Sequence, residues 1–155
     1  MSEKAQQESD DFSGVVVSIG TDHYETEVRA IPTGHAFVAD EPGSLGGTNK
    51  GPNPFDLLLA SVGTCKVITC RMYADRKGWP VDRIVATVSL DRRLPDDAAS
   101  SEAESDKRDF IDTEMQFVGD LDDDQRKRLL EISNKCPVHK MITGDLRSSS
   151  KVVTE

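Results

Sequence analysis

The segment at residues 53–78, NPFDLLLASVGTCKVITCRMYADRKG, constrains the fold of this chain more than any other. Asn53 is a residue type that caps helices, and Pro54 suits the first helical position because its missing N–H is not needed there. Gly78 is a preferred helix stop. Between these ends the residues on nearly every side of the helix are apolar or small, so a sheet or a partner must cover the helix almost all round. The segment predicts a long central helix that encloses Cys65 in apolar surroundings.

Alternating apolar residues predict strands on both sides of this helix in the sequence. A second helix is expected at residues 122–135, where three aspartates favour the first turn, and Pro137 could begin another helical turn. This order predicts an α+β fold with antiparallel sheets wrapped on the central helix. The expected strands are residues 14–19, 23–31, 35–39, 83–90 and 110–118, with a last strand in the tail at 147–154.

Size and charge restrict the organisation and the partners of the chain. Its 155 residues suffice for one domain, expected at 14–155 after a disordered polar tail at 1–13. A net charge of −9 argues against nucleic acid or an anionic membrane as a partner. Because the N-terminus lacks a signal-peptide core and no apolar run is long enough to cross a bilayer, we expect a cytoplasmic protein. Three cysteines in such a chain indicate reduced thiols rather than a disulfide framework.

The three cysteines are expected to lie in different environments. Cys65 is about eleven residues into its helix, too far for the helix N-terminus to lower its pKa, so a reactive Cys65 needs a cation from elsewhere in the fold. Cys136 precedes Pro137 and could sit at a helix N-terminus, where free N–H groups favour a thiolate. Cys70 lies roughly 140° around the helix from Cys65, so the two cannot form a disulfide, and Cys70 is expected to be a small core residue.

Three interpretations of these residues remain open on spacing alone. In the first, Cys65 attacks a peroxide and becomes a sulfenic acid, which Cys136 resolves to a disulfide. In the second, Cys65, Cys70, Cys136 and His139 bind zinc, since their side chains are ligand types that zinc accepts. In the third, the cysteines are buried spectators in a binding module.

Two separated motifs resemble the OsmC/Ohr family of osmotically induced and organic hydroperoxide resistance proteins. They are GPNPFDLLLASVGTC, which ends at Cys65, and CPVHK, which begins at Cys136. The branch that the chain looks most like also carries GHAFVADEP before the helix and RMYADRKGWP at its end. The resemblance extends over residues 15–153. It implies an OsmC-like fold in an intertwined homodimer, with two central helices enclosed by sheets from both chains.

The resemblance also implies a function and its residues. Members reduce organic hydroperoxides or hydrogen peroxide with two cysteines, so Cys65 would be the nucleophile and Cys136 the resolving thiol. No metal or organic cofactor is implied, and electrons would come from a small dithiol or a lipoylated protein. The alternative is a non-enzymatic OsmC-like domain that senses redox state or binds a small hydrophobic ligand.

One position departs from the peroxidase pattern of this family. Members carry a glutamate after the Asn-Pro of the helix, where it holds an activating arginine; here that position is Phe55, and the acid comes one residue later at Asp56. One residue is about 100° of helical rotation, so Asp56 does not replace the glutamate directly. Arg29 lies in the region that supplies the arginine and is the candidate cation. Other groups that could approach the sulfur are Arg92, Arg93 and His35.

Overall fold

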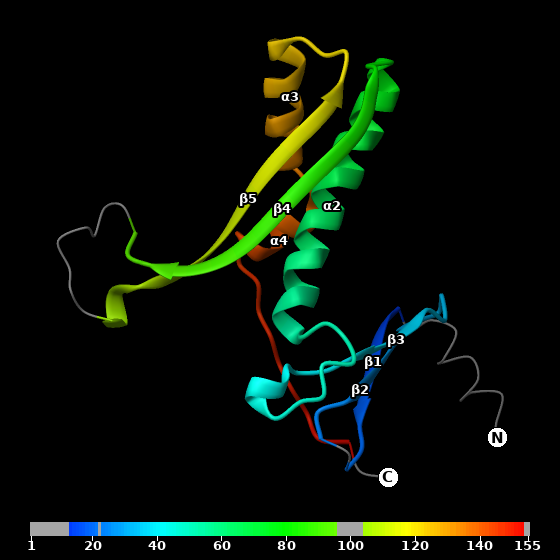
Figure 1. Ribbon diagram of the computed structural model, residues 1–155, viewed down its shortest axis with the longest axis vertical. Coiled ribbons are helices and arrows are strands. Elements are labelled where there is room, and N and C mark those ends of the chain that lie inside the picture. Colours follow the sequence, from blue (N-terminus) through cyan, green and yellow to red (C-terminus); the bar gives the residue numbers. More distant parts are fainter. Residues whose placement is uncertain (1–12, 22, 96–103, 154–155) are drawn as a thin grey trace. The chain divides into compact units, whose positions relative to one another are not determined.

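The computed structural model describes residues 13–21, 23–95 and 104–153. The predicted tail at 1–13 lies outside these residues except for Ser13. The order of strands and helices is that of an α+β protein, as predicted (Figure 1). The elements are β1 (Gly14–Ile19), β2 (Thr26–Ile31), β3 (Ala36–Ala39), the short 3-10 helix η1 (Gly43–Leu45), α2 (Pro54–Lys77), β4 (Val81–Arg93), η3 (Glu104–Asp106), β5 (Arg108–Gly119), α3 (Asp123–Ser133) and α4 (Pro137–Ile142).

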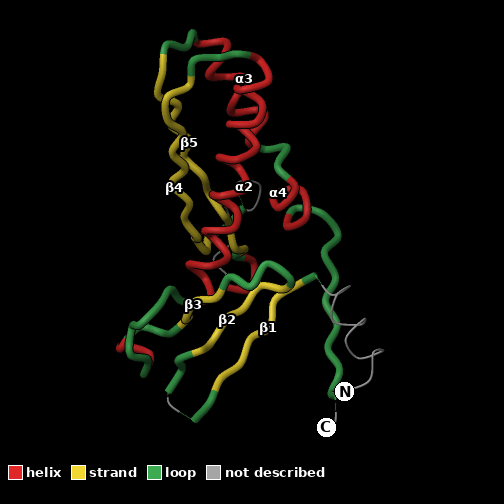
Figure 2. Tube along the Cα trace, turned by 90° about the vertical axis from the view of Figure 1, so that its right-hand side faces the viewer, coloured by secondary structure: helices red, strands yellow, loops and turns green. Residues whose placement is uncertain are grey.

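The chain divides into two compact units, and the division falls within α2 after Leu58. The first unit holds a three-stranded antiparallel sheet in the order β1-β2-β3, with Val28 of β2 opposite Val17 and Phe37 of its neighbours (Figure 2). β2 begins at Thr26 rather than at residue 23, because His23 adopts φ +53° in the preceding turn. A positive φ lies outside strand geometry, which explains the shorter strand.

A buried aspartate organises the glycine-rich loop between β3 and α2. The Asp40 carboxylate accepts hydrogen bonds from the backbone N–H groups of Glu41, Thr48 and Lys50 and, at 2.7 Å, from the Thr48 hydroxyl. The Thr48 hydroxyl contributes most to lowering the pKa of Asp40 to about 2. The loop is therefore fixed by its own residues at the point where the chain enters α2.

Both ends of α2 follow the prediction from sequence. The Asn53 side chain accepts the Asp56 N–H at 3.0 Å, and the Asp56 carboxylate accepts the Asn53 N–H at 3.1 Å. This reciprocal pair satisfies two N–H groups of the first turn. At the other end Gly78 adopts φ +65°, the conformation in which glycine terminates helices. Asp56 is thus engaged in capping the helix.

Only one face of α2 is covered within the described residues, and cover of the other face by a partner stays a prediction. On the other face Ile68 is 52% exposed, Met72 is 68% exposed, and Cys65 is partly exposed. We call these three residues the open face of α2. By length and composition α2 is also the one helix of the described residues that could span a membrane, but core helices of soluble proteins meet the same test. Its buried residues are Val62, Gly63, Lys66, Cys70 and Ala74.

In the second unit, β4 and β5 form a long antiparallel pair that runs along α2 (Figure 1). Gly63 of α2 permits this close packing, because a Cβ atom there would lie 3.1 Å from a Val88 methyl of β4. Both strands are longer than predicted from apolar alternation. Charged residues extend them: Arg93 pairs with Asp112 of β5 at 2.5 Å, and its guanidinium lies 4.1 Å from the Phe110 ring.

Gly119, at the end of β5, is a position where a side chain does not fit. It adopts φ +144°, and an added Cβ would lie 2.1 Å from the Pro80 carbonyl oxygen. We expect Gly119→Ala to lower the free energy of unfolding by about 2–3 kcal/mol, measured by urea denaturation. Gly43→Ala is the control, because nothing lies within 4 Å of its added Cβ. Equal stability of the two variants would contradict the strain at Gly119.

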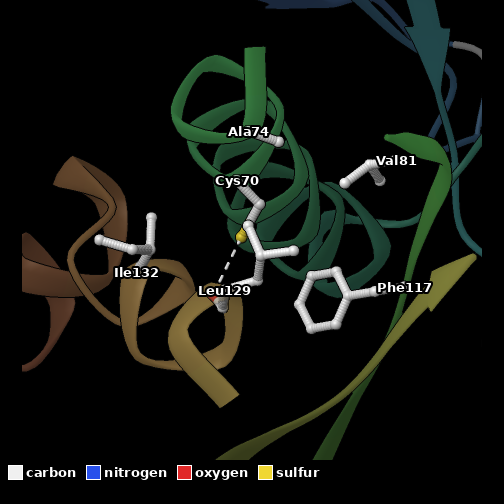
Figure 3. Close-up of a cluster of buried hydrophobic side chains, with 6 residues drawn as sticks. All are labelled: Cys70, Ala74, Val81, Phe117, Leu129 and Ile132. Carbon is white, nitrogen blue, oxygen red and sulfur yellow. Dashed lines mark hydrogen bonds between the residues drawn. The ribbon is translucent and has the colours of Figure 1, made fainter. Parts of the chain in front are cut away.

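The buried core of the second unit joins α2, the strand pair and α3 (Figure 3). Cys70 and Ala74 of α2 pack against Leu129 of α3, and the Cys70 thiol donates a hydrogen bond to the Leu129 carbonyl at 3.3 Å. Cys70 is thus a core residue, as predicted. The remaining members of the cluster are Val81, Phe117 and Ile132.

The two C-terminal helices begin at residues that the sequence singled out. Asp122 caps α3 in a reciprocal pair with Gln125. Pro137 is the first residue of α4, and Cys136 is its N-cap residue. The predicted last strand is wrong over residues 147–153, which form no strand in the structure, and the side chains of Val152 and Val153 are exposed there.

Candidate thiol site

The structure brings Cys65 and Cys136 together. Cys65 lies on α2 and is partly exposed, whereas Cys136 caps α4 and is fully buried. Cys65 raises the pKa of Cys136, which makes the two thiols neighbours, and both cysteines are reduced. Cys65 belongs to the open face of α2, so its enclosure in apolar surroundings stays a prediction that depends on a partner covering this face. A deep thiol and a more accessible thiol therefore form one pair.

The surroundings of Cys136 raise the pKa of its thiol. Burial is the main cause, and the neighbouring Cys65 raises this pKa further. Two neighbours oppose this shift: the His139 N–H, which donates to the Cys136 sulfur at 3.3 Å, and the charge of Lys66. Because the raising effects dominate, the pKa of Cys136 lies above the ordinary value of a thiol, and Cys65 is the more exposed sulfur of the two.

Lys66 is the cation beside these thiols, and sequence analysis did not select it. Its side chain is 3% exposed, and its ammonium donates a hydrogen bond to the Asn134 side chain at 2.8 Å. Its charge lowers the pKa of Cys70 and of Cys136 relative to burial alone, and it lowers the pKa of His139. The sequence feature that could have identified Lys66 is its place in an otherwise apolar helix, next to the cysteine of the motif.

Cys70 does not join this pair. Burial raises its pKa to about 11, against the smaller lowering effect of Lys66, and its S–H group is directed to Leu129. Cys70 therefore stays a protonated core thiol at neutral pH. Among the described residues no group of three or more His, Cys, Asp or Glu side chains is arranged to hold a metal ion. The described residues therefore contain no cluster of ligands that would support the zinc interpretation.

The other candidate cations have partners of their own. Arg29 belongs to the first unit, on β2, where it forms an exposed ion pair with Glu27 at 2.5 Å. Arg92 pairs with Asp109, and Arg93 pairs with Asp91 and Asp112. His35 follows the turn after β2, where its carbonyl accepts the Ala30 N–H at 2.8 Å. Phe55, at the position of the family glutamate, is 62% exposed.

His139 is a neutral neighbour of the thiols at physiological pH. Burial and, secondarily, the charge of Lys66 lower the pKa of its imidazole below the ordinary value of 6.5. At neutral pH the imidazole is therefore uncharged, so Lys66 remains the positive group of the site. Its backbone N–H, rather than its ring, contacts the Cys136 sulfur.

A cavity of about 460 Å³ adjoins this site within the second unit. Lys66, Asn134 and His139 form part of its polar lining, and two carboxylates of β5, Asp109 and Asp112, also reach it. Arginines partner both carboxylates, at 3.1 Å for Asp109 and 2.5 Å for Asp112. The apolar lining is Val62, Phe110, Ile111, Leu130 and Ile142.

The fold and the paired thiols define an α+β protein whose candidate site contains two neighbouring cysteines. The sequence model of the OsmC-like protein family matches residues 47–150, more than half of the chain. The chain therefore belongs to the OsmC-like family, as its motifs predicted. The comparison with curated proteins finds no match.

Solved structures share this fold at low sequence identity. The OsmC-like protein from Mycoplasma pneumoniae is 18% identical, with a TM-score of 0.65 over 88% of this chain and 90% of that one. The organic hydroperoxide resistance protein OhrB of Bacillus subtilis is 22% identical, with a TM-score of 0.54 over 86% and 92%. An organic hydroperoxide resistance protein from Elizabethkingia anophelis is 14% identical, with a TM-score of 0.60 over 86% and 91%. At these identities the comparisons establish the fold.

Proposed function

We propose that this protein is a thiol-dependent peroxidase that reduces organic hydroperoxides with Cys65 and Cys136. The observation that carries the proposal is that a partly exposed thiol and a buried thiol of raised pKa are neighbours. A two-cysteine peroxidase needs such an asymmetric pair, because one sulfur must meet the substrate while the other waits for its product. Family membership and the hydroperoxide resistance proteins among the structural neighbours support the same activity.

The first step of the proposed cycle oxidises Cys65. Its thiolate attacks the terminal oxygen of R–O–O–H, so that an S–O bond forms and the O–O bond breaks. The electron pair of the broken bond leaves with the alkoxide, which takes a proton from solvent and departs as the alcohol ROH. Cys65 is left as a sulfenic acid, the first level of thiol oxidation.

The second step joins the two sulfur atoms. The Cys136 sulfur attacks the Cys65 sulfur, an S–S bond forms, and the S–O bond breaks with loss of water, which carries the Cys136 proton. The two thiols are neighbours, and in this step they approach each other to the bonded distance of about 2.05 Å. A small dithiol or a lipoylated protein then restores both thiols by exchange and becomes a disulfide itself.

The assembly that we propose is a homodimer. Ile68 and Met72 of the open face are apolar, and a second copy of the chain would cover them. The same cover would complete the apolar surroundings of Cys65 and favour alkyl hydroperoxides over strongly hydrated substrates. Arg29 of the first unit is proposed as an additional cation for this site.

The proposed activity is tested by turnover. Reduced protein is mixed with cumene hydroperoxide and an excess of dithiol, and peroxide is measured with time. We expect many equivalents of peroxide to be consumed per chain, with formation of a Cys65–Cys136 disulfide when the dithiol is withheld. Consumption that stops at about one equivalent per chain despite excess dithiol would instead favour redox sensing. No thiol oxidation by peroxide would exclude both functions.

A further inference from the structure

Lys66 is a buried cation that no acidic side chain neutralises within the described residues. It is 3% exposed, and its ammonium makes one hydrogen bond, at 2.8 Å, to the neutral Asn134 side chain. Among residues 13–21, 23–95 and 104–153, no carboxylate lies within 4 Å of this ammonium. A buried charge without a counter-ion is unfavourable, so the position of Lys66 calls for an anion that is not a carboxylate of the described chain.

The ionisable groups that the charge of Lys66 influences include two thiols. Its charge acts on Cys70, Cys136 and His139, and Cys65 is the preceding residue. His139 carries no negative charge in either protonation state. Cys70 is committed to the core by its hydrogen bond to Leu129. The remaining source of negative charge is the pair of neighbouring thiols, Cys65 and Cys136.

We infer that Lys66 is the counter-cation of the thiolate that forms at the Cys65–Cys136 pair, while Asn134 positions the ammonium. Lys66 lies on the same helix as Cys65 and thereby supplies the positive charge that a side chain from another element would otherwise supply. Its importance for catalysis rests on the proposed function, but its effect on thiol ionisation does not.

Other charged groups around the pair do not duplicate this role. On α4, His139 is uncharged at neutral pH. The carboxylates that β5 contributes to the adjoining cavity, Asp109 and Asp112, pair with Arg92 and Arg93. The end of α3 contributes the neutral Asn134. The net positive contribution next to the thiols is therefore that of Lys66.

The test is the pH dependence of thiol alkylation in the full-length reduced protein. Iodoacetamide reacts with thiolates, and mass spectrometry assigns the modified cysteine, so the rate at Cys65 against pH reports its ionisation. We expect Lys66→Met to move the profile upward by about one pH unit and to slow alkylation at pH 7 by about tenfold, with Lys66→Arg restoring most of the rate. Lys140→Met, which removes an exposed charge from α4, is the matched control and should leave the profile in place.

A second variant keeps the lysine and neutralises its charge. Asn134→Asp places a carboxylate on the Lys66 ammonium with almost no change in side-chain size, so it should move the profile in the same direction as Lys66→Met. A profile unchanged in both variants, with melting temperatures showing folded protein, would overturn the inference. If the wild-type protein reduces no peroxide but the profile still moves, the proposed function fails and the role of Lys66 stands. If the wild-type protein reduces peroxide but the profile is unchanged in both variants, the proposed function stands and Lys66 is not the counter-cation of the thiols.

Discussion

With Cys65 replaced by serine, the initial rate of cumene hydroperoxide reduction is expected to fall by about a thousandfold or more. A serine hydroxyl stays protonated at neutral pH, and its oxygen cannot become a sulfenic acid, so the first step loses its nucleophile. Cys65 is partly exposed, and exchanging sulfur for oxygen there should leave the fold intact. The measurement is peroxide loss with excess dithiol, alongside circular dichroism of the variant.

Cys136→Ser should give a different result in the same assay, because Cys136 acts only after the first oxidation. The first equivalent of peroxide should still react with Cys65, and the sulfenic acid should then persist and be trapped by dimedone at that residue. Later turnovers should slow, since an external thiol must approach Cys65 without the help of the neighbouring Cys136 sulfur. The two variants together separate the attacking thiol from the resolving one.

Cys70→Ala is the matched control for both substitutions. It removes the remaining thiol, which lies in the core and is directed to Leu129. We expect the peroxide rate to stay within about twofold of wild type and the free energy of unfolding to fall by about 1–2 kcal/mol. Full activity of Cys65→Ser, or an equal loss of activity in Cys70→Ala, would contradict the assigned roles.

The predictions that succeeded depended on local chemistry. Asn53, Asp56 and Gly78 lie within a few residues of the helix ends that they define, and their hydrogen bonds follow from that proximity. The same holds for Asp122 and for Cys136 before Pro137, whose spacing marks the start of a helix. Capping is decided over three or four residues, so sequence alone could predict these ends.

The thiol site depended on contacts that spacing does not encode. The approach of Cys65 to Cys136 was implied by family resemblance, whereas composition and spacing left two other interpretations open beside it. Lys66 was missed because an isolated lysine in an apolar helix gives no sign of its partner, and Asn134 lies far along the chain. The cations considered instead, such as Arg93, turned out to hold the strand pair together. Electrostatic partners of this kind follow from tertiary packing.

The open face of α2 supports the second large expected effect, on assembly. Cys65, Ile68 and Met72 are spaced by three and four residues, so they form one stripe along the helix. The stripe lies opposite the buried face, and its two large apolar members are 52% and 68% exposed. Burying such side chains is favourable by about 1.5–3 kcal/mol each, which suits an interface between copies of the chain.

Ile68→Asp is therefore expected to weaken the homodimer by at least about a hundredfold, because each copy would bury an unpaired carboxylate in an apolar interface. Sedimentation velocity across a concentration series measures this change, and Ile68→Leu, which keeps the apolar surface on the same helix, should remain dimeric. Since Cys65 belongs to the same stripe, loss of the dimer should also make its alkylation faster at a fixed pH. A wild-type monomer at high concentration, or an Ile68→Asp dimer as tight as wild type, would show that something else covers α2.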